Sequence, residues 1–138
     1  MRLIIDSNII FAALIRNSTA RRILASDISF CAPDTMLREI RKHTEEILQK
    51  SGLDAENFEL LLTLFMESIE IVPREGYASS VDEALRILGK EHIGDIPFLA
   101  LAFAIENDGI WTNDKDFERQ NKAKVWKTKD LVAHLGIR

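Results

Sequence analysis

The stretch that decides the fold is Ile110–Phe117, with the sequence IWTNDKDF. Its apolar beginning is typical of a short buried strand, and that strand ends abruptly in hydroxyl, amide and carboxylate groups. Asp108 and Gly109 predict a turn just before it. Two carboxylates at the end of a buried strand are costly unless a positive group lies between them.

The amino terminus shows the same pattern. The apolar run Leu3–Ile5 leads directly into Asp6, Ser7 and Asn8. In a parallel sheet the ligand crevice lies beyond the carboxyl ends of the strands, where the strand order reverses. If the first and fourth strands are neighbours, Asp6 and Asp114 face one crevice, although the residue pattern alone leaves this adjacency open.

Short apolar runs alternate with helical patterns along the rest of the chain, which predicts an α/β domain with a mostly parallel sheet. We expect one domain over residues 1–138, with a loop over residues 73–80. The expected strands cover residues 2–5, 28–32, 69–72, 110–112 and 125–127. The expected helices cover residues 8–15, 19–25, 34–50, 54–66, 81–88, 95–105 and 129–135.

The composition is that of a globular protein, with 46% hydrophobic and 29% charged residues. The single cysteine excludes an internal disulfide, and no stretch approaches the ~20 apolar residues of a membrane span or resembles a signal peptide. We therefore expect a cytoplasmic protein with no membrane partner. The net charge of −4 argues against bulk nucleic-acid binding. If four of the acids are metal ligands, however, the remaining residues have no net charge, so net charge does not decide the question.

Each acidic candidate also has a purely structural interpretation. Asp6, Asp95 and Asp114 could cap helices or turns, and Asp116 could be a first-turn acid favoured by the helix dipole. Glu39 lies among basic residues, as on a solvated helix face. The positions of the acids taken together argue for a functional site. The first turns of the helix after the second strand, which contain Glu39, should lie near the carboxyl ends of the strands, where Asp6 and Asp114 are also expected.

Glu39 and Glu46 share one flank of that expected helix. At 1.5 Å per residue, Glu39 lies ~7.5 Å along the helix from its start and Glu46 ~18 Å along it. Only Glu39 is then at the level of the crevice.

Converging carboxylates without bases beside them favour Mg²⁺ or Mn²⁺, which take oxygen ligands. Zinc is disfavoured, because His43, His92 and His134 show no ligand spacing. No motif supports serine or cysteine hydrolase chemistry, and no glycine-rich phosphate loop is present.

With these segments the chain resembles PIN-domain ribonucleases, including the toxin subunits of toxin–antitoxin systems, along nearly its whole length. The matching segments are residues 3–8, Glu39, residues 94–96 before the 99–102 helix, and residues 111–117. The resemblance implies a three-layer fold with sheet order 3-2-1-4-5. It also implies Mg²⁺- or Mn²⁺-dependent cleavage of RNA.

The resemblance assigns roles to seven residues. Four of them map onto the acidic catalytic and metal-binding positions: Asp6, Glu39, Asp95 and Asp114. Three lie beside these positions: Asn8, Thr112 and Asp116. Of these three, Asp116 is a further candidate metal ligand. We expect an endoribonuclease acting on single-stranded or loop RNA that leaves a 5′-phosphate and a 3′-hydroxyl. RNA is the expected partner, and the toxin resemblance leaves open an antitoxin protein and a homodimer.

Two other functions compete with this one. A non-catalytic PIN-like module would bind RNA or a protein and keep the acids as relics, although the complete acidic set argues against decay. A haloacid-dehalogenase-like phosphatase also begins with an aspartate after its first strand. It requires a second aspartate two residues later, where this chain has Asn8.

Overall fold

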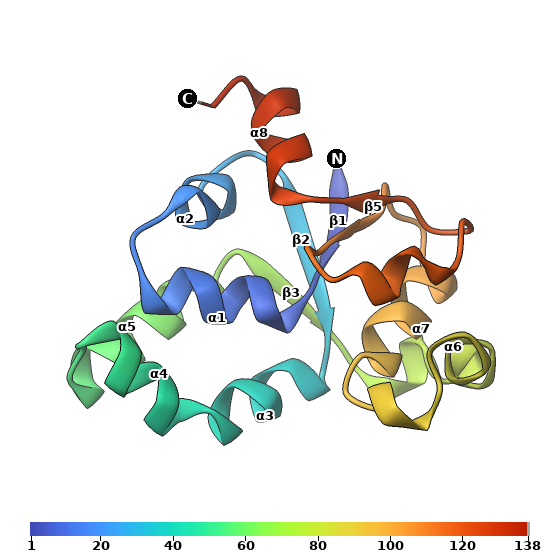
Figure 1. Cartoon of the computed structure of the whole chain (residues 1–138), viewed down its shortest axis with the longest axis horizontal. Coiled ribbons are helices and arrows are strands. Elements are labelled where there is room, and N and C mark those ends of the chain that lie inside the picture. The colour runs from blue at the N-terminus through green and yellow to red at the C-terminus, as the bar shows by residue number, and fades with distance from the viewer. Residues whose placement is uncertain (138) are drawn as a thin grey trace.

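Five parallel strands form a single sheet at the centre of the structure, a computed structural model that describes residues 1–137 (Figure 1). The expected domain also included Arg138, which lies outside the described residues. The order β3-β2-β1-β4-β5 confirms the expected topology. The strands are β1 (Arg2–Ile5), β2 (Ser29–Pro33), β3 (Ile69–Val72), β4 (Ile110–Trp111) and β5 (Val125–Trp126).

Eight α-helices and four 3₁₀ turns connect and flank the strands within the described residues. The helices are α1 (Ser7–Ile15), α2 (Thr19–Leu24), α3 (Thr35–Lys42), α4 (Thr44–Ser51), α5 (Ala55–Met66), α6 (Val81–Leu88), α7 (Ile96–Ala104) and α8 (Thr128–Leu135). The 3₁₀ turns are η1 (Arg74–Gly76), η2 (Ala78–Ser80), η3 (Lys90–His92) and η4 (Lys115–Arg119).

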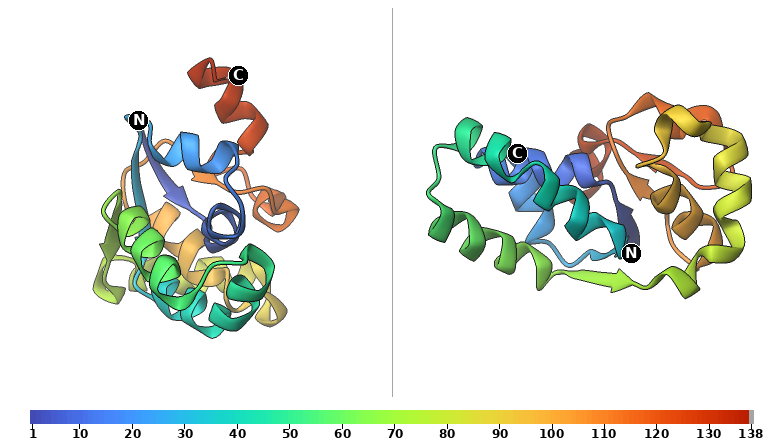
Figure 2. Two further views of the ribbon diagram at one scale, coloured as in Figure 1. Left: turned by 90° about the vertical axis from the view of Figure 1, so that its left-hand side faces the viewer. Right: turned by 90° about the horizontal axis from the view of Figure 1, so that it is seen from below.

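The helices cover both faces of the sheet. The chain passes from β1 through β2 to β3 in one direction and then returns to β4, so right-handed crossovers place α1–α5 and the α6–α7 pair on opposite faces. Figure 1 and the view from below in Figure 2 show these two groups apart, with the strands between them. Helix α7 packs against β1 and β2, and α8 packs against α2. The expected three-layer α/β fold is confirmed.

Burial in the core explains why the segments that form β1 and α7 are apolar in sequence. Leu3, Ile4 and Ile5 of β1 are completely buried, because helices cover both faces of this central strand. Helix α7 is apolar on every side, and Phe98–Leu101 are also completely buried. At ~1.5–3 kcal/mol for each large apolar side chain removed from water, this central layer fixes where the polar residues after the strands must lie.

The expected single helix over residues 34–50 is wrong. It is two helices, α3 and α4, which meet at His43, whose φ of −107° and ψ of 16° are not helical. The Thr44 hydroxyl donates to the Arg41 carbonyl at 3.0 Å, a local bond that competes with continued helix. The His43 ring contacts Phe11 of α1 edge to face, so packing on the neighbouring helix stabilises the break.

Smaller differences concern the ends of elements. The expected loop over residues 73–80 contains η1 and η2, and β4 and β5 are each one residue shorter than expected. Helix α1 begins at Ser7 and α8 at Thr128, one residue earlier than expected. Because β4 ends at Trp111, Thr112 follows this strand instead of belonging to it. The other differences of one or two residues leave the acidic residues after the same strands.

Candidate metal centre

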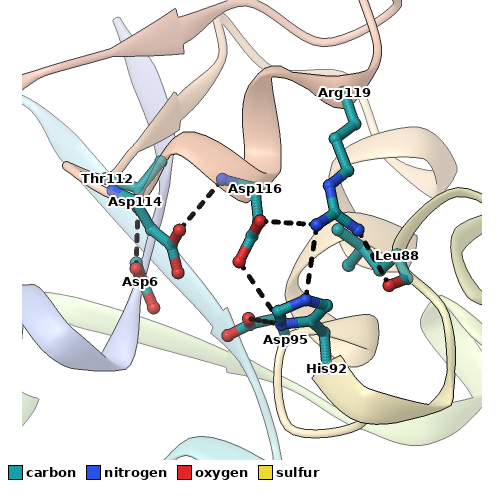
Figure 3. A network of polar contacts seen from close by, with 8 residues as sticks. All are labelled: Asp6, Leu88, His92, Asp95, Thr112, Asp114, Asp116 and Arg119. Carbon is teal, nitrogen blue, oxygen red and sulfur yellow. Dashed lines mark hydrogen bonds and ion pairs between the residues drawn. The ribbon is translucent and has the colours of Figure 1, made fainter.

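The centre of the candidate site lies where β1 and β4 end side by side. Ile5 pairs with Trp111, so the next residues, Asp6 and Thr112, are neighbours although they are 106 positions apart in sequence. The Thr112 hydroxyl donates to Asp6 Oδ2 at 2.7 Å, and both residues are buried (Figure 3). Asp6 Oδ1 also accepts a long bond of 3.4 Å from the Asn8 backbone N–H, so Asp6 does cap α1.

Asp114 is fixed by the same threonine. Its backbone N–H donates to the Thr112 hydroxyl at 3.0 Å, and its Oδ1 accepts from the Asp116 backbone N–H at 2.9 Å. This second bond caps the 3₁₀ turn η4 and directs the Asp114 and Asp116 carboxylates toward the same region (Figure 3). The expected turn-capping role is therefore present, and it orients Asp114 beside Asp6.

Asp95 approaches from the start of α7, on the other face of the sheet. It occupies the N-cap position but its side chain makes no capping hydrogen bond, contrary to the structural interpretation. Its backbone is in the right-handed helical region (φ −85°, ψ −19°), whereas a capping residue is usually extended. Among residues 1–137, no N–H or O–H donates a hydrogen bond to the Asp95 carboxylate, which lies in the same network of side chains as Asp6, Asp114 and Asp116 (Figure 3).

The electrostatics show that these acids face one another. Burial, followed by the nearby charges of Asp6 and Asp114, raises the pKa of Asp95 to about 6, and Asp116 adds to the increase. Burial also raises the pKa of Asp6; the Thr112 hydroxyl opposes this increase and the Asp114 charge reinforces it. Carboxylates that raise one another's pKa are unfavourable neighbours unless a cation lies between them.

Glu39 lies at the edge of this group. Its Oε2 is 3.9 Å from the position that a Cβ would occupy on Gly94, the residue before Asp95. Glu39 also pairs with Lys42 at 3.4 Å. Glu46 lies on α4, where it pairs with Lys50 and His43. The two glutamates therefore lie on different helices and have different partners.

The supporting residues differ in their surroundings. The Thr112 hydroxyl joins two of the aspartates, as described above. The Asn8 side chain is exposed, and only its backbone N–H contacts Asp6.

Two residues that the sequence did not single out complete the site. His92 Nδ1 lies 3.3 Å from Asp116 Oδ2 and 4.0 Å from Asp95 Oδ2. Arg119 Nη2 lies 2.9 Å from Asp116 Oδ1 and 3.5 Å from His92 Nε2, and its Nη1 donates to the Leu88 carbonyl at 3.2 Å (Figure 3). His92 lies three residues before Asp95, and Arg119 lies three residues after Asp116. This spacing is the only feature of the sequence that could have indicated them.

The donor set fits a divalent cation. Four aspartates from three separate segments face one another with carboxylate oxygens that a cation could use, and Asp95 has no competing hydrogen bond from the described residues. Mg²⁺ and Mn²⁺ prefer such ligands. His92, Asp95 and Asp116 also each bring a ligand atom within 4.8 Å of the other two.

Comparison with models of protein families shows to which family the chain belongs. The family model for the PIN domain matches residues 4–136, nearly the whole chain. The chain belongs to the PIN-domain family. PIN domains are generally nucleases and typically use divalent metals, and this PIN domain has the corresponding nuclease-type fold. Comparison with curated proteins finds no significant match. None of the helices in residues 1–137 is both long and apolar enough to span a membrane.

Proposed function

We propose that this PIN-domain protein is a metal-dependent endoribonuclease that hydrolyses phosphodiester bonds in single-stranded or loop RNA. The observation that carries the proposal is the convergence of Asp6, Asp95 and Asp114, from three segments, with the pKa of two of them raised. A relic site would not need to preserve this arrangement at the cost of repulsion between its acids. This favours an enzyme over the non-catalytic module.

The roles of the residues follow from their places. Asp6, Asp95 and Asp114 would hold Mg²⁺ or Mn²⁺, and the two hydrogen bonds of Thr112 fix Asp6 and Asp114 relative to each other. Glu39, at the edge, binds the same ion or orients a water molecule. The cation, when bound, supplies a hydroxide nucleophile at neutral pH and neutralises charge on the phosphate. The expected products carry a 5′-phosphate and a 3′-hydroxyl.

Two basic residues are suited to contact the RNA backbone. Arg38 precedes Glu39, and Lys115 lies between Asp114 and Asp116. Both are exposed, and neither forms an ion pair with another residue of the described chain. Arg41 differs, because it is bound by Glu59 through two hydrogen bonds. Arg38→Gln and Lys115→Gln should therefore weaken RNA binding more than Arg41→Gln.

The test compares nucleic acids and metals. Purified protein with millimolar Mn²⁺ or Mg²⁺ should cut a mixed-sequence single-stranded RNA, and chelation should stop the reaction. A DNA strand of the same sequence and a fully paired RNA duplex serve as comparison substrates. Equal cleavage of all three would overturn the substrate class, and cleavage that continues in chelator would overturn the metal dependence.

The partner expectations are proposals of the same kind. If this ribonuclease is the toxin of a toxin–antitoxin pair, expression of the chain alone should arrest growth, and co-expression of a small DNA-binding protein encoded beside it should restore growth. Sedimentation of the purified chain tests the homodimer.

A further inference from the structure

One part of the site is not explained by an all-carboxylate cation site. His92 lies in η3 and presents Nδ1 to Asp116 and Asp95, while Arg119 faces its other ring nitrogen. The side chains of His92, Asp95 and Asp116 are 21–25% exposed, so solvent and ions can reach them. The three come from two segments, because His92 and Asp95 are only three residues apart and Asp116 lies on η4. Their ligand atoms lie within 4.8 Å of one another, and Asp6 and Asp114 are not part of this group.

The separations suit a single ion. Metal bonds of about 2.0–2.2 Å place neighbouring ligand atoms roughly 3.0–3.5 Å apart and opposite ones up to about 4.4 Å apart. The His92 Nδ1 distances of 3.3 Å to Asp116 and 4.0 Å to Asp95 are close to this range. All three ligand atoms lie within 4.8 Å of one another, slightly more than one ion spans, so the side chains would move closer together to bind it.

We propose that His92 is a metal ligand, and that with Asp95 and Asp116 it forms a cation position beside that of Asp6 and Asp114, which selects a first-row transition ion such as Mn²⁺ over Mg²⁺. The inference rests on the proposed metal-dependent function, because Asp95 is shared between the two positions. Imidazole nitrogen is a good ligand for transition ions, whereas Mg²⁺ is bound almost entirely by oxygen.

Arg119 is the competing cation in this arrangement. The donor and acceptor roles across the 3.5 Å contact between Arg119 Nη2 and His92 Nε2 depend on the tautomer of His92. A guanidinium only donates, so the tautomer that forms this hydrogen bond accepts at Nε2 and carries its proton on Nδ1, toward Asp116. Binding of a metal at Nδ1 needs that lone pair and places the proton on Nε2, against Arg119. The Arg119 side chain is 43% exposed and can move outward when a metal ion binds.

The direct test is spectroscopic and does not depend on catalysis. Mn²⁺ bound to the wild-type protein should show spin-echo modulation from a ligand ¹⁴N, and labelling with ¹⁵N-histidine should replace it with that of ¹⁵N. His92→Gln and His92→Asn should lose the signal and lower Mn²⁺ affinity on the order of tenfold, with Mg²⁺ affinity changed much less. His43→Gln is the matched control and should keep the signal. Arg119→Gln should raise Mn²⁺ affinity roughly two- to fivefold, since an exposed ion pair contributes little.

The outcomes separate this inference from the proposed function. Bound Mn²⁺ without a nitrogen signal in the wild-type protein would overturn the role of His92, and RNA cleavage would then still support the ribonuclease. A nitrogen signal that persists in both His92 variants would also overturn it. A histidine signal in a protein that cuts no RNA would support the metal site and contradict the proposed function. Weaker Mn²⁺ binding in Arg119→Gln would overturn the competition.

Discussion

Replacing Asp95 with asparagine should stabilise the protein when no metal is present. Burial and the charges of Asp6 and Asp114 raise the pKa of Asp95 to about 6, against an ordinary value of 3.8. Because the folded state resists ionisation, a charged Asp95 destabilises it above that pKa, and the penalty disappears as the pH falls toward the unfolded value. Asparagine has the same shape and no charge.

The size of the effect follows from the shift. A difference of roughly two pKa units at 1.36 kcal/mol each gives about 3 kcal/mol at pH 7, and the same linkage leaves about half a kcal/mol at pH 4. The raised pKa already includes the attraction between Asp95 and His92. Because the Asp95 side chain is partly exposed and solvent screens its charge, we expect about 1–3 kcal/mol at pH 7. For a chain of this length that is roughly 3–10 °C in melting temperature.

The assay is a set of thermal melts with chelator and with millimolar Mn²⁺. In chelator at pH 7, Asp95→Asn and Asp114→Asn should melt at or above the wild-type temperature, and the Asp95→Asn gain should shrink toward pH 4. Mn²⁺ should stabilise the wild type by RT ln(1 + [L]/Kd), about 3 kcal/mol at one hundred times Kd, and the variants clearly less. Asp27→Asn, an exposed turn residue before β2, is the control. Variants that melt lower in chelator, beside a wild type indifferent to Mn²⁺, would mean that these carboxylates are structural and that the repulsion does not exist.

Three further predictions test other parts of the structure. Glu39→Gln should lose most RNA cleavage while Glu46→Gln stays near wild type, and equal losses in a cleavage assay would show that α3 does not deliver Glu39 to the site. Thr112→Val should lower the free energy of unfolding by ~1–3 kcal/mol, because it removes hydrogen bonds from the buried Asp6 carboxylate and the partly buried Asp114 N–H, while Thr112→Ser restores most of the loss in urea melts. Burial and the bond to Asp34 raise the pKa of Tyr77, the only tyrosine, to about 12. An absorbance titration should show this value, with Asp34→Asn lowering it but not to the ordinary 10; an unchanged curve in that variant would contradict the bond.

Much of the fold could be predicted because short apolar strands alternate with helices. Leu3–Ile5 and Ile110–Trp111 are apolar because both faces of those strands are covered, and the acids that follow them then lie at one edge. The adjacency of β1 and β4 did not follow from that pattern. It came from resemblance to the PIN-domain family, and the strand order confirms it.

The remaining features depend on contacts between distant segments. The helix break at His43 is stabilised by Phe11 on another helix, so helical periodicity could not reveal it. Asp95 has the sequence of a capping residue, but its helical backbone keeps the side chain from capping. His92 has no histidine partner at metal-ligand spacing, because its neighbours are Asp95, three residues later, and Asp116 on the distant turn η4.

The proposed ribonuclease is tested most directly by single-turnover cleavage of a 5′-labelled single-stranded RNA with Mn²⁺. The wild-type protein should cut it and leave 5′-phosphate and 3′-hydroxyl ends. Asp6→Asn, which keeps a side chain of the same size at the centre of the site, should lose at least ~100-fold in rate, as enzymes do when a catalytic group is removed. Asp27→Asn should cut at the wild-type rate. Cleavage at equal rates by the wild type and Asp6→Asn would indicate a contaminating nuclease and would contradict the proposed function.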